Sequence, residues 1–489
     1  MNTPIRRLAV ACLVLFLALM GNATYVQYIQ ASELNSHANN KRVIDDEYSR
    51  ERGAILVGGE AVAESVPSDD QFEFLRTYPA GPLYAHLTGY FSYTYGRSAV
   101  ENAQNSVLSG SDNRLFVNRV VDLLANKQPK GGSVDLTIDG VGQQTAAQAL
   151  AALPAGTKGA VVALDPRTGA VLTMVSQPSY DPNQLASHDF SAVNQAWTAL
   201  SEDPNQPMLN RATQEIQPPG STFKLVTASA ALENLNLNPA SIVQGGSELS
   251  FPGITYTLPN AGGGNCGGDQ ITLERALNVS CNVTFGSLAM QVGQGALAEQ
   301  AAKFGFGDRL IENIASNASR FATDGADLEA PQLAQSGIGQ FEVAATPLQM
   351  AMVAAGIAND GVVMTPYLVQ TVRDPSLRVL DDAGDGEEYS TALSPQSAQM
   401  MQQMMISTVN SGTASSARIN GVEVGGKTGT AQRGNGLPNL AWFASFASAG
   451  DQQVAVAVMI ESAQATDDIS GGRLAGPIAR SVMEALLAP

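Results

Sequence analysis

The longest apolar stretch of the chain lies at its beginning. Leu8 to Val26 is interrupted by only three small or polar residues, and its 19 residues span roughly 28 Å as a helix. That length nearly matches the hydrocarbon core of a bilayer. Because Arg6 and Arg7 precede it, we expect a single-pass anchor in the cell membrane with a cytoplasmic N-terminus. Everything after Tyr28 is then extracytoplasmic.

A cleaved signal peptide is the alternative interpretation of this stretch, because Gly21-Asn22-Ala23 is a small-x-small site. The stretch is long for a signal peptide, which favours a retained anchor. Cys12 lies in its middle with apolar residues continuing after it. We therefore interpret Cys12 as an apolar side chain rather than as a lipid-attachment site.

Beyond the anchor, hydrophobic periodicity is weak at first and strong later. Residues 32–129 are polar and punctuated by glycine, and the sequence KQPKGG at 127–132 is a break of the kind found between domains. We predict three units: the anchor over residues 1–30, a small, mainly β module over residues 31–130, and a larger domain over residues 131–489.

The larger domain begins and ends with predicted strands. The sequence predicts strands with period-two or β-rich patterns at Ser133 to Asp139, Gly159 to Leu164, Ala170 to Val175, Val422 to Gln432, Ala441 to Ala447 and Val454 to Ile460. It predicts helices at Gly142 to Leu153, Gln399 to Ile406 and Pro477 to Leu487. The methionines of the second helix indicate a core face rather than a metal site. Strands at both ends of a mostly helical insert predict an α+β fold, in which one antiparallel sheet is flanked by helices and the insert forms a helical lobe.

Composition supports a folded chain and excludes several functions. The 489 residues are 44% hydrophobic and 15% charged, which suits a packed core. A formal net charge of -18 would repel a polyanion, so we expect no nucleic-acid partner. Three histidines and three cysteines, with no HExxH and no CxxC, argue against a zinc site or a thioredoxin-like redox pair. We expect no metal and no cofactor, and chemistry based on hydroxyls, amines or carboxylates.

Among the seven lysines, only Lys224 follows a serine, Ser221, by three residues. The preceding Pro-Pro-Gly ends one element and residues 225–232 are helical in composition, which places Ser221 in the first turn of a helix. Residues i and i+3 share a helix face, so we expect the Lys224 amine to lie against the Ser221 hydroxyl. A buried amine with a lowered pKa can then take the proton of a nucleophilic serine.

Two further segments are weaker candidates when taken alone. Lys427, in the sequence GGKTGT, is a second cation that would lower the pKa of Lys224, although a solvated lysine beside a turn is the simpler interpretation. Ser280 and Asn282 flank Cys281 after a helical segment, and in isolation they indicate a capping loop.

Together, the three motifs resemble those of penicillin-recognising serine D,D-peptidases and β-lactamases. An SxxK at 221, an SxN at 280 and a KTG at 427 occur in the order of that family, separated by 59 and 147 residues. Five other segments resemble class B penicillin-binding proteins of the penicillin-binding protein A type: Arg52-Gly53, Arg76 to Tyr90, Gly96 to Glu101, Ser336 to Gly361 and Ser411 to Ala414. One departure is that Arg52-Gly53-Ala54-Ile55 is followed by Leu-Val-Gly-Gly and not by the usual Asp-Arg-Asn-Gly turn.

The resemblance implies a peptidoglycan D,D-transpeptidase that works through a serine acyl-enzyme and that β-lactams inhibit covalently. Ser221 is then the nucleophile and Lys224 its base, while Ser280 relays a proton and Asn282 fixes Lys224 and the substrate. Lys427, Thr428, Gly429 and Thr430 bind the terminal carboxylate, and the backbone N–H groups of Ser221 and Thr430 form an oxyanion hole.

The same resemblance assigns partners and a role to the module. Peptidoglycan stem peptides are the substrates, and other membrane proteins of cell-wall synthesis or division are expected partners. Residues 31–130 would be a non-catalytic pedestal or dimerisation-like module. Two alternatives remain: a D,D-carboxypeptidase or β-lactamase on the same fold, and a sensor without catalytic activity.

Two cysteines remain outside the anchor, Cys266 and Cys281. An oxidising compartment allows a disulfide between them, which would fix the wall that contains Ser280. Two separate buried thiols are the alternative.

Overall fold

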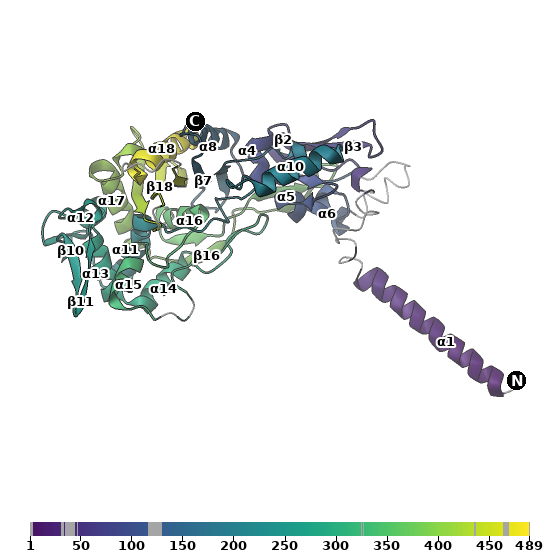
Figure 1. Ribbon diagram of the computed structural model, residues 1–489, viewed down its shortest axis with the longest axis horizontal. Helices are drawn as coiled ribbons and strands as arrows, with labels where there is room; N and C mark the ends of the chain where they lie inside the picture. Colours follow the sequence, from purple (N-terminus) through teal and green to yellow (C-terminus); the bar gives the residue numbers. More distant parts are fainter. Residues whose placement is uncertain are drawn as a thin grey trace.

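The computed structural model describes residues 3–30, 34, 45, 47–115, 130–323, 325, 327–434, 437–462 and 469–488. Figure 1 shows an elongated molecule, with helix α1 projecting from one end, the N-terminal module in the middle and the larger domain at the other end. Residues 127–129 of the predicted boundary lie outside the described residues, so the division near residue 130 stays a prediction.

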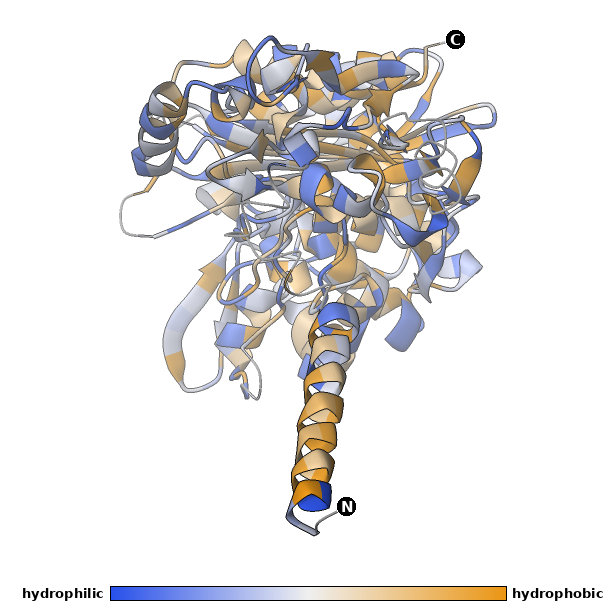
Figure 2. Ribbon diagram, turned by 90° about the vertical axis from the view of Figure 1, so that its right-hand side faces the viewer, coloured by the Kyte–Doolittle hydropathy of each residue, from blue (hydrophilic) through white to orange (hydrophobic). Residues whose placement is uncertain are grey.

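The apolar N-terminal stretch forms a helix, as predicted. Helix α1 spans Thr3–Thr24 and continues as a π-helical turn over Tyr25–Ile29. Over Thr3–Ile29 it is 27 residues long and apolar enough to cross a membrane. None of its residues is buried in the structure, and hydrophobic residues cover most of its surface (Figure 2). Its length and exposure are those of a helix whose partner is lipid.

Strands from the first and the last parts of the larger domain meet in one antiparallel sheet, which confirms the predicted α+β fold. The first predicted strand, at Ser133 to Asp139, is not part of this sheet. The strand order is β17-β18-β19-β7-β8. These strands span Lys158–Leu164 (β7), Val171–Gln177 (β8), Glu423–Ala431 (β17), Leu440–Ala449 (β18) and Gln452–Glu461 (β19). Strand β17, which carries the KTG sequence, lies at one edge of this sheet.

Helices cover both faces of this sheet because alternate residues of its strands are apolar on both sides. Helices α8 (Gly140–Ala151) and α18 (Gly476–Leu486) pack on one face. Helix α16 (Pro347–Ala358), with every residue buried, packs on the other. Burial on both faces fixes the register of β17 and therefore the position of its polar residues.

The insert forms the predicted helical lobe. Its main helices are α11 (Lys224–Asn234), α12 (Leu273–Asn278), α13 (Asn282–Val292), α14 (Gln294–Lys303), α15 (Ala330–Ser336) and α17 (Pro395–Ser411). Met401, Met404 and Met405 are buried on one side of α17, as the methionine pattern predicts. The lobe also contains hairpins that the pattern did not indicate, among them β10 (Glu248–Phe251) with β11 (Ile254–Pro259).

A second sheet joins the N-terminal module to the larger domain. Its strand order is β15-β14-β6-β1-β2-β3, in which β3 spans Phe74–Thr77, β14 spans Val369–Arg373 and β15 spans Val379–Asp382. Strand β6 (Ser133–Leu136), which belongs in sequence to the larger domain, pairs in parallel with β1 (Ile55–Val57) of the module. Helix α10 (Phe190–Glu202) lies along the module in Figure 1, and its Trp197 ring stacks on Tyr95 at 4.1 Å. The two parts therefore pack as one body.

The unusual Leu-Val-Gly-Gly sequence of the module forms a hairpin turn. Strand β1 ends at Val57 and β2 (Glu60–Pro67) begins opposite it, so Gly58 and Gly59 form a two-residue loop. Both glycines have positive φ, +57° and +85°. This is the conformation that a type I′ turn requires at both positions, and glycine adopts it at little cost.

Three of the family-like segments of the module meet in one buried ion cluster. Glu101 is fully buried, and its two carboxylate oxygens accept hydrogen bonds from Arg52 Nε at 2.6 Å and Arg76 Nε at 2.7 Å. Burial alone would raise the pKa of Glu101, but the two guanidinium groups lower it below the ordinary value. The cluster therefore holds Arg52, Arg76 and Glu101 as a paired network in the module core.

Candidate active site

Ser221 lies in a short 3-10 turn directly before a helix. The turn covers Gly220–Thr222 and α11 begins at Lys224, so Ser221 precedes the predicted helix rather than forming its first turn. Gly220 has a φ of +54°, and a Cβ atom placed on it would lie 2.7 Å from the carbonyl oxygen of Thr430. Glycine at this position lets the turn contact β17. It thereby brings the half-buried Ser221 beside the KTG strand.

The structure brings the side chains of the three motifs together. Lys224 is fully buried, and its amine donates to Asn282 Oδ1 at 2.6 Å, to the Ser280 carbonyl at 2.7 Å and to Ser280 Oγ at 3.2 Å. Among the described residues, its hydrogen-bond partners are thus Ser280 and Asn282, and not the Ser221 hydroxyl as the sequence predicted. Catalytic hydrogen bonds often tighten only with substrate present, so this geometry is compatible with a base.

Lys427 approaches the same hydroxyl from β17. Its amine is also fully buried and donates to Ser280 Oγ at 2.8 Å and to the Thr428 carbonyl at 2.9 Å. The hydroxyl of Ser280 therefore lies between two lysine amines. Ser280 has a φ of +58°, a conformation that a serine adopts only where its surroundings impose it.

Burial changes the acid–base properties of both lysines. Loss of hydration, followed by repulsion from Lys427, lowers the pKa of Lys224 well below its ordinary value. Burial lowers the pKa of Lys427 to about 7. Because both shifts favour the neutral amine, Lys224 has the property that a general base near neutral pH needs.

The KTG segment offers a polar edge beside Ser221. Thr428 is buried and its hydroxyl lies 2.9 Å from the Thr413 hydroxyl, whereas Thr430 is exposed. A Cβ atom on Gly429 would lie 2.9 Å from the carbonyl oxygen of Pro219, so only glycine fits comfortably between β17 and the nucleophile turn. As an edge strand, β17 has backbone groups that no neighbouring strand covers.

Sequence reasoning missed Asn260, which positions the SxN segment. Its Oδ1 accepts from the backbone N–H of Asn282 at 2.8 Å and of Val283 at 3.2 Å, at the N-terminus of α13. Its Nδ2 donates to the carbonyls of Gly246 and Gly264. The sequence feature that could have indicated Asn260 is its position directly before the Gly-rich sequence AGGGNCGG, where an asparagine commonly organises a loop.

Of the two alternatives for the extracytoplasmic cysteines, the structure contains the disulfide. Cys266 and Cys281 are bonded across 15 positions of the chain, with their Cα atoms 5.7 Å apart. The bond ties the Gly-rich loop to the residue between Ser280 and Asn282. Cys12 is a free, exposed thiol on α1.

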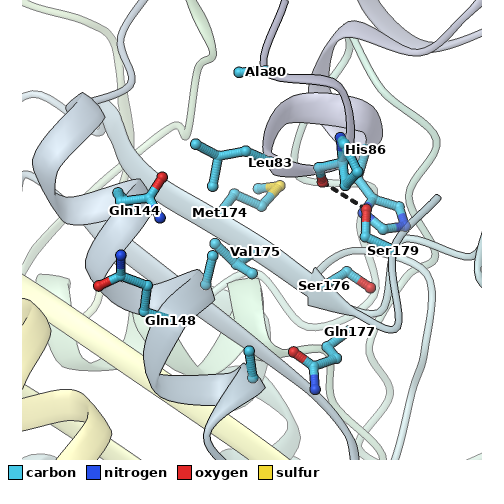
Figure 3. Close-up of a pocket in the computed structure, with 13 residues that line it drawn as sticks. Ala80, Leu83, His86, Gln144, Gln148, Met174, Val175, Ser176, Gln177 and Ser179 are labelled. Atoms are coloured by element: carbon cyan, nitrogen blue, oxygen red, sulfur yellow. Dashed lines mark hydrogen bonds between the residues drawn. The ribbon is translucent and has the colours of Figure 1, made fainter. Parts of the chain in front are cut away.

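A cavity lies elsewhere in the molecule. It has a volume of about 460 Å³ and opens between α4 (Gly81–Thr88) of the module and α8 and β8, with Leu83, Met174, Gln144 and Gln148 among its lining residues (Figure 3). The buried Gln143 bridges the same junction, because its amide bonds the backbone of Met174 and the Leu83 carbonyl. No predicted site residue lines this cavity, so its size does not mark the catalytic centre.

Comparison with known proteins identifies the family. Residues 159–484 match the penicillin binding protein transpeptidase domain, and residues 52–134 match the penicillin binding protein A dimerisation domain. The chain belongs to the penicillin-binding protein transpeptidase family. The matched domain contains all three motifs, from Ser221 to Thr430.

Relatives of this penicillin-binding protein match it over its whole length. The peptidoglycan D,D-transpeptidase PbpA of Mycolicibacterium smegmatis is 42% identical over 100% of this chain and 99% of the relative. PbpA of Mycobacterium tuberculosis is 40% identical over the same shares. The structure of penicillin-binding protein A from M. tuberculosis as a ceftriaxone acyl-enzyme has a TM-score of 0.86 at 39% identity, covering 91% of this chain and 100% of that one. The imipenem acyl-enzyme of the same protein has a TM-score of 0.84 at 39% identity, covering 90% of this chain and 100% of that one.

Proposed function

We propose that this protein is a membrane-anchored peptidoglycan D,D-transpeptidase that forms an acyl-enzyme on Ser221. The observation that carries the proposal is the pair of buried lysine amines on the Ser280 hydroxyl, beside Ser221. A second support is that similar structures from M. tuberculosis are β-lactam acyl-enzymes. β-Lactams are accordingly covalent inhibitors of this chain.

Acylation begins with attack of Ser221 Oγ on the penultimate D-Ala carbonyl of a stem peptide. Neutral Lys224 takes the hydroxyl proton as the new C–O bond forms, and the peptide C–N bond then breaks. Ser280 passes a proton to the leaving nitrogen, and the terminal D-Ala departs as a free amino acid. Asn282 holds the Lys224 amine in place through the 2.6 Å hydrogen bond.

The edge of β17 fixes the substrate for that attack. Lys427 and the hydroxyls of Thr428 and Thr430 bind the terminal carboxylate by charge-assisted hydrogen bonds, and Gly429 allows the close approach of the backbone. The backbone N–H groups of Ser221 and Thr430 stabilise the oxyanion. In other acyl-transfer enzymes, removal of one such donor costs roughly 3 to 4 kcal/mol in activation free energy.

Deacylation by an amine produces the cross-link. The amine of a neighbouring stem peptide attacks the Ser221 ester, its proton passes to the base, and Ser221 is released with a new amide bond formed. The acyl group thus ends on a second peptide and the enzyme returns to its initial state.

The membrane anchor and the N-terminal module are suited to an enzyme that acts on the cell wall outside the membrane. Helix α1 is retained, with Arg6 and Arg7 on the cytoplasmic side, and residues 31–130 act as a non-catalytic pedestal. Membrane proteins of cell-wall synthesis or division are the proposed partners. The support is the exposed apolar surface of α1 and its place at the end of the molecule farthest from β17 (Figure 1).

Product analysis with a stem-peptide donor and an amine acceptor tests the proposal. A transpeptidase yields the cross-linked product and free D-Ala, whereas a D,D-carboxypeptidase yields the shortened, hydrolysed peptide and free D-Ala. A β-lactamase hydrolyses a β-lactam and leaves the stem peptide unchanged. A sensor yields neither product, although a fluorescent penicillin would still label it if Ser221 reacted.

A further inference from the structure

Phe341 combines two features that are individually costly for a phenylalanine. Its side chain is 43% exposed, although it is large and apolar. Its backbone has a φ of +60°, in the left-handed region where bulky residues are genuine outliers. Glycine or asparagine would satisfy this backbone more easily, and a polar side chain would satisfy the exposure. Neither the backbone conformation nor the exposure to solvent therefore explains why a phenylalanine occupies this position.

Neighbouring contacts hold the segment around Phe341 in this conformation. The Glu342 carbonyl accepts from Arg320 Nε at 3.0 Å, and the Glu342 carboxylate accepts from the Thr323 N–H at 2.7 Å. On the other side, the Gln340 N–H donates to the Gln335 carbonyl at 3.0 Å. The residues on both sides of Phe341 are thus fixed, as is typical where a strained conformation serves a function.

This segment runs beside the residues that precede the nucleophile. The Gly220 N–H donates to the Gly339 carbonyl at 2.9 Å, and Gln217 exchanges two backbone hydrogen bonds with Ala345. A Cβ atom on Gly339 would lie 2.1 Å from the Gly220 carbonyl oxygen, so the two chains touch. Phe341 lies between these two connections. Phe341 is therefore an exposed aromatic residue close to the turn that contains Ser221.

We propose that Phe341 is a specificity-determining residue that contacts the apolar, non-reacting part of the acyl donor. The inference rests on the proposed function. Covering an exposed aromatic ring with an aliphatic or aromatic group stabilises the complex. This contact involves neither the reacting carbonyl nor the carboxylate of the donor. Donors with an apolar group next to the scissile bond are thereby preferred over donors without one.

The test compares two β-lactam donors that share the reacting ring and carboxylate. Benzylpenicillin carries an aromatic side chain and 6-aminopenicillanic acid carries none. In Phe341→Gly and Phe341→Asn, which both suit the backbone, we expect the second-order acylation rate constant for benzylpenicillin to fall about tenfold. The rate constant for 6-aminopenicillanic acid should stay within about twofold of wild type, because that donor lacks the group that the ring contacts.

Leu377→Gly is the matched control. Leu377 is also exposed, at 70%, and also has a positive φ, +65°, but it lies in the turn between β14 (Val369–Arg373) and β15 (Val379–Asp382). This variant should leave both rate constants unchanged. Equal loss for both donors in the Phe341 variants, or no loss for either, would overturn the inference. If wild-type Ser221 itself stayed unlabelled by both donors, the proposed function would fail instead.

Discussion

At the scale of single residues, the site is organised around one hydroxyl. Ser280 Oγ receives hydrogen bonds from Lys427 at 2.8 Å and Lys224 at 3.2 Å. A hydroxyl between two amines can pass a proton only when at least one amine is neutral. The lowered pKa of both lysines meets that condition near neutral pH, and burial is its main cause.

We propose different roles for the two lysines, and replacing each in turn should distinguish these roles. Lys224→Ala should slow acylation by several orders of magnitude, because Lys224 is the proposed base for the Ser221 proton. Lys427→Ala should slow acylation less and should mainly weaken capture of donors with a free carboxylate. Stopped-flow acylation by a fluorescent penicillin measures both effects, and the reverse ranking would contradict the assignment of the base.

The pH dependence of acylation should be bell-shaped. The rate constant rises with pH as Lys224 becomes neutral, and it falls as pH increases through the pKa of Lys427, about 7, because the neutral amine no longer attracts the carboxylate. In Lys427→Ala the neighbouring positive charge is absent, so the pKa of Lys224 rises and the ascending limb moves to higher pH. A shift of that limb to lower pH would contradict the stated cause.

At the scale of elements, three structural elements meet at the site. They are the turn before α11, the N-terminus of α13, and the edge strand β17. Long periodic segments of the sequence predicted the central sheet, α8 and α18 to within a few residues, because burial of one face gives a segment a regular hydrophobic period. The helix predicted at Gln399 to Ile406 covers only the middle of α17. The parallel pairing of β6 with β1 and the β10–β11 hairpin could not be predicted, because partner choice depends on tertiary packing.

The disulfide links one of these elements, the N-terminus of α13, to a loop rich in glycine. In the chain-entropy model, a bridge closing a loop of this length contributes about 3 kcal/mol to stability. Reduction should leave the folded protein intact but loosen Ser280 and Asn282, so the acylation rate should fall more than the unfolding temperature. Cys12→Ser is the background for the experiment, because it leaves the Cys266–Cys281 pair as the only thiols. An unchanged acylation rate after verified reduction would show that the disulfide has no role in shaping the site.

At the scale of the whole molecule, the chain places its catalytic lobe away from a lipid-facing helix. The shared sheet β15-β14-β6-β1-β2-β3 and the stacking of Trp197 on Tyr95 join the module to the larger domain. The SxxK, SxN and KTG motifs predicted Lys224, Ser280, Asn282 and Lys427, whose side chains the structure brings together, whereas Asn260 was found only in the fold. Asn260 orients neighbouring backbone groups, a role that leaves no spacing pattern in the sequence.

The anchor should remain attached to the mature protein. Thr3–Ile29 is 27 residues long, more than a bilayer core requires, so the protein should fractionate with membranes as the full chain. N-terminal sequencing or intact mass measurement distinguishes the two cases. A mature protein that begins at Thr24 or Tyr25 would instead indicate signal cleavage at or just after Ala23.

Covalent labelling of Ser221 tests the central claim most directly. After incubation with benzylpenicillin, mass spectrometry of a digest should find the acyl group on the peptide that contains Ser221. Ser221→Ala should show no label and should unfold at nearly the wild-type temperature, because the lost hydroxyl is small and only half-buried. Labelling retained in folded Ser221→Ala, or an acyl group on another residue, would contradict the account.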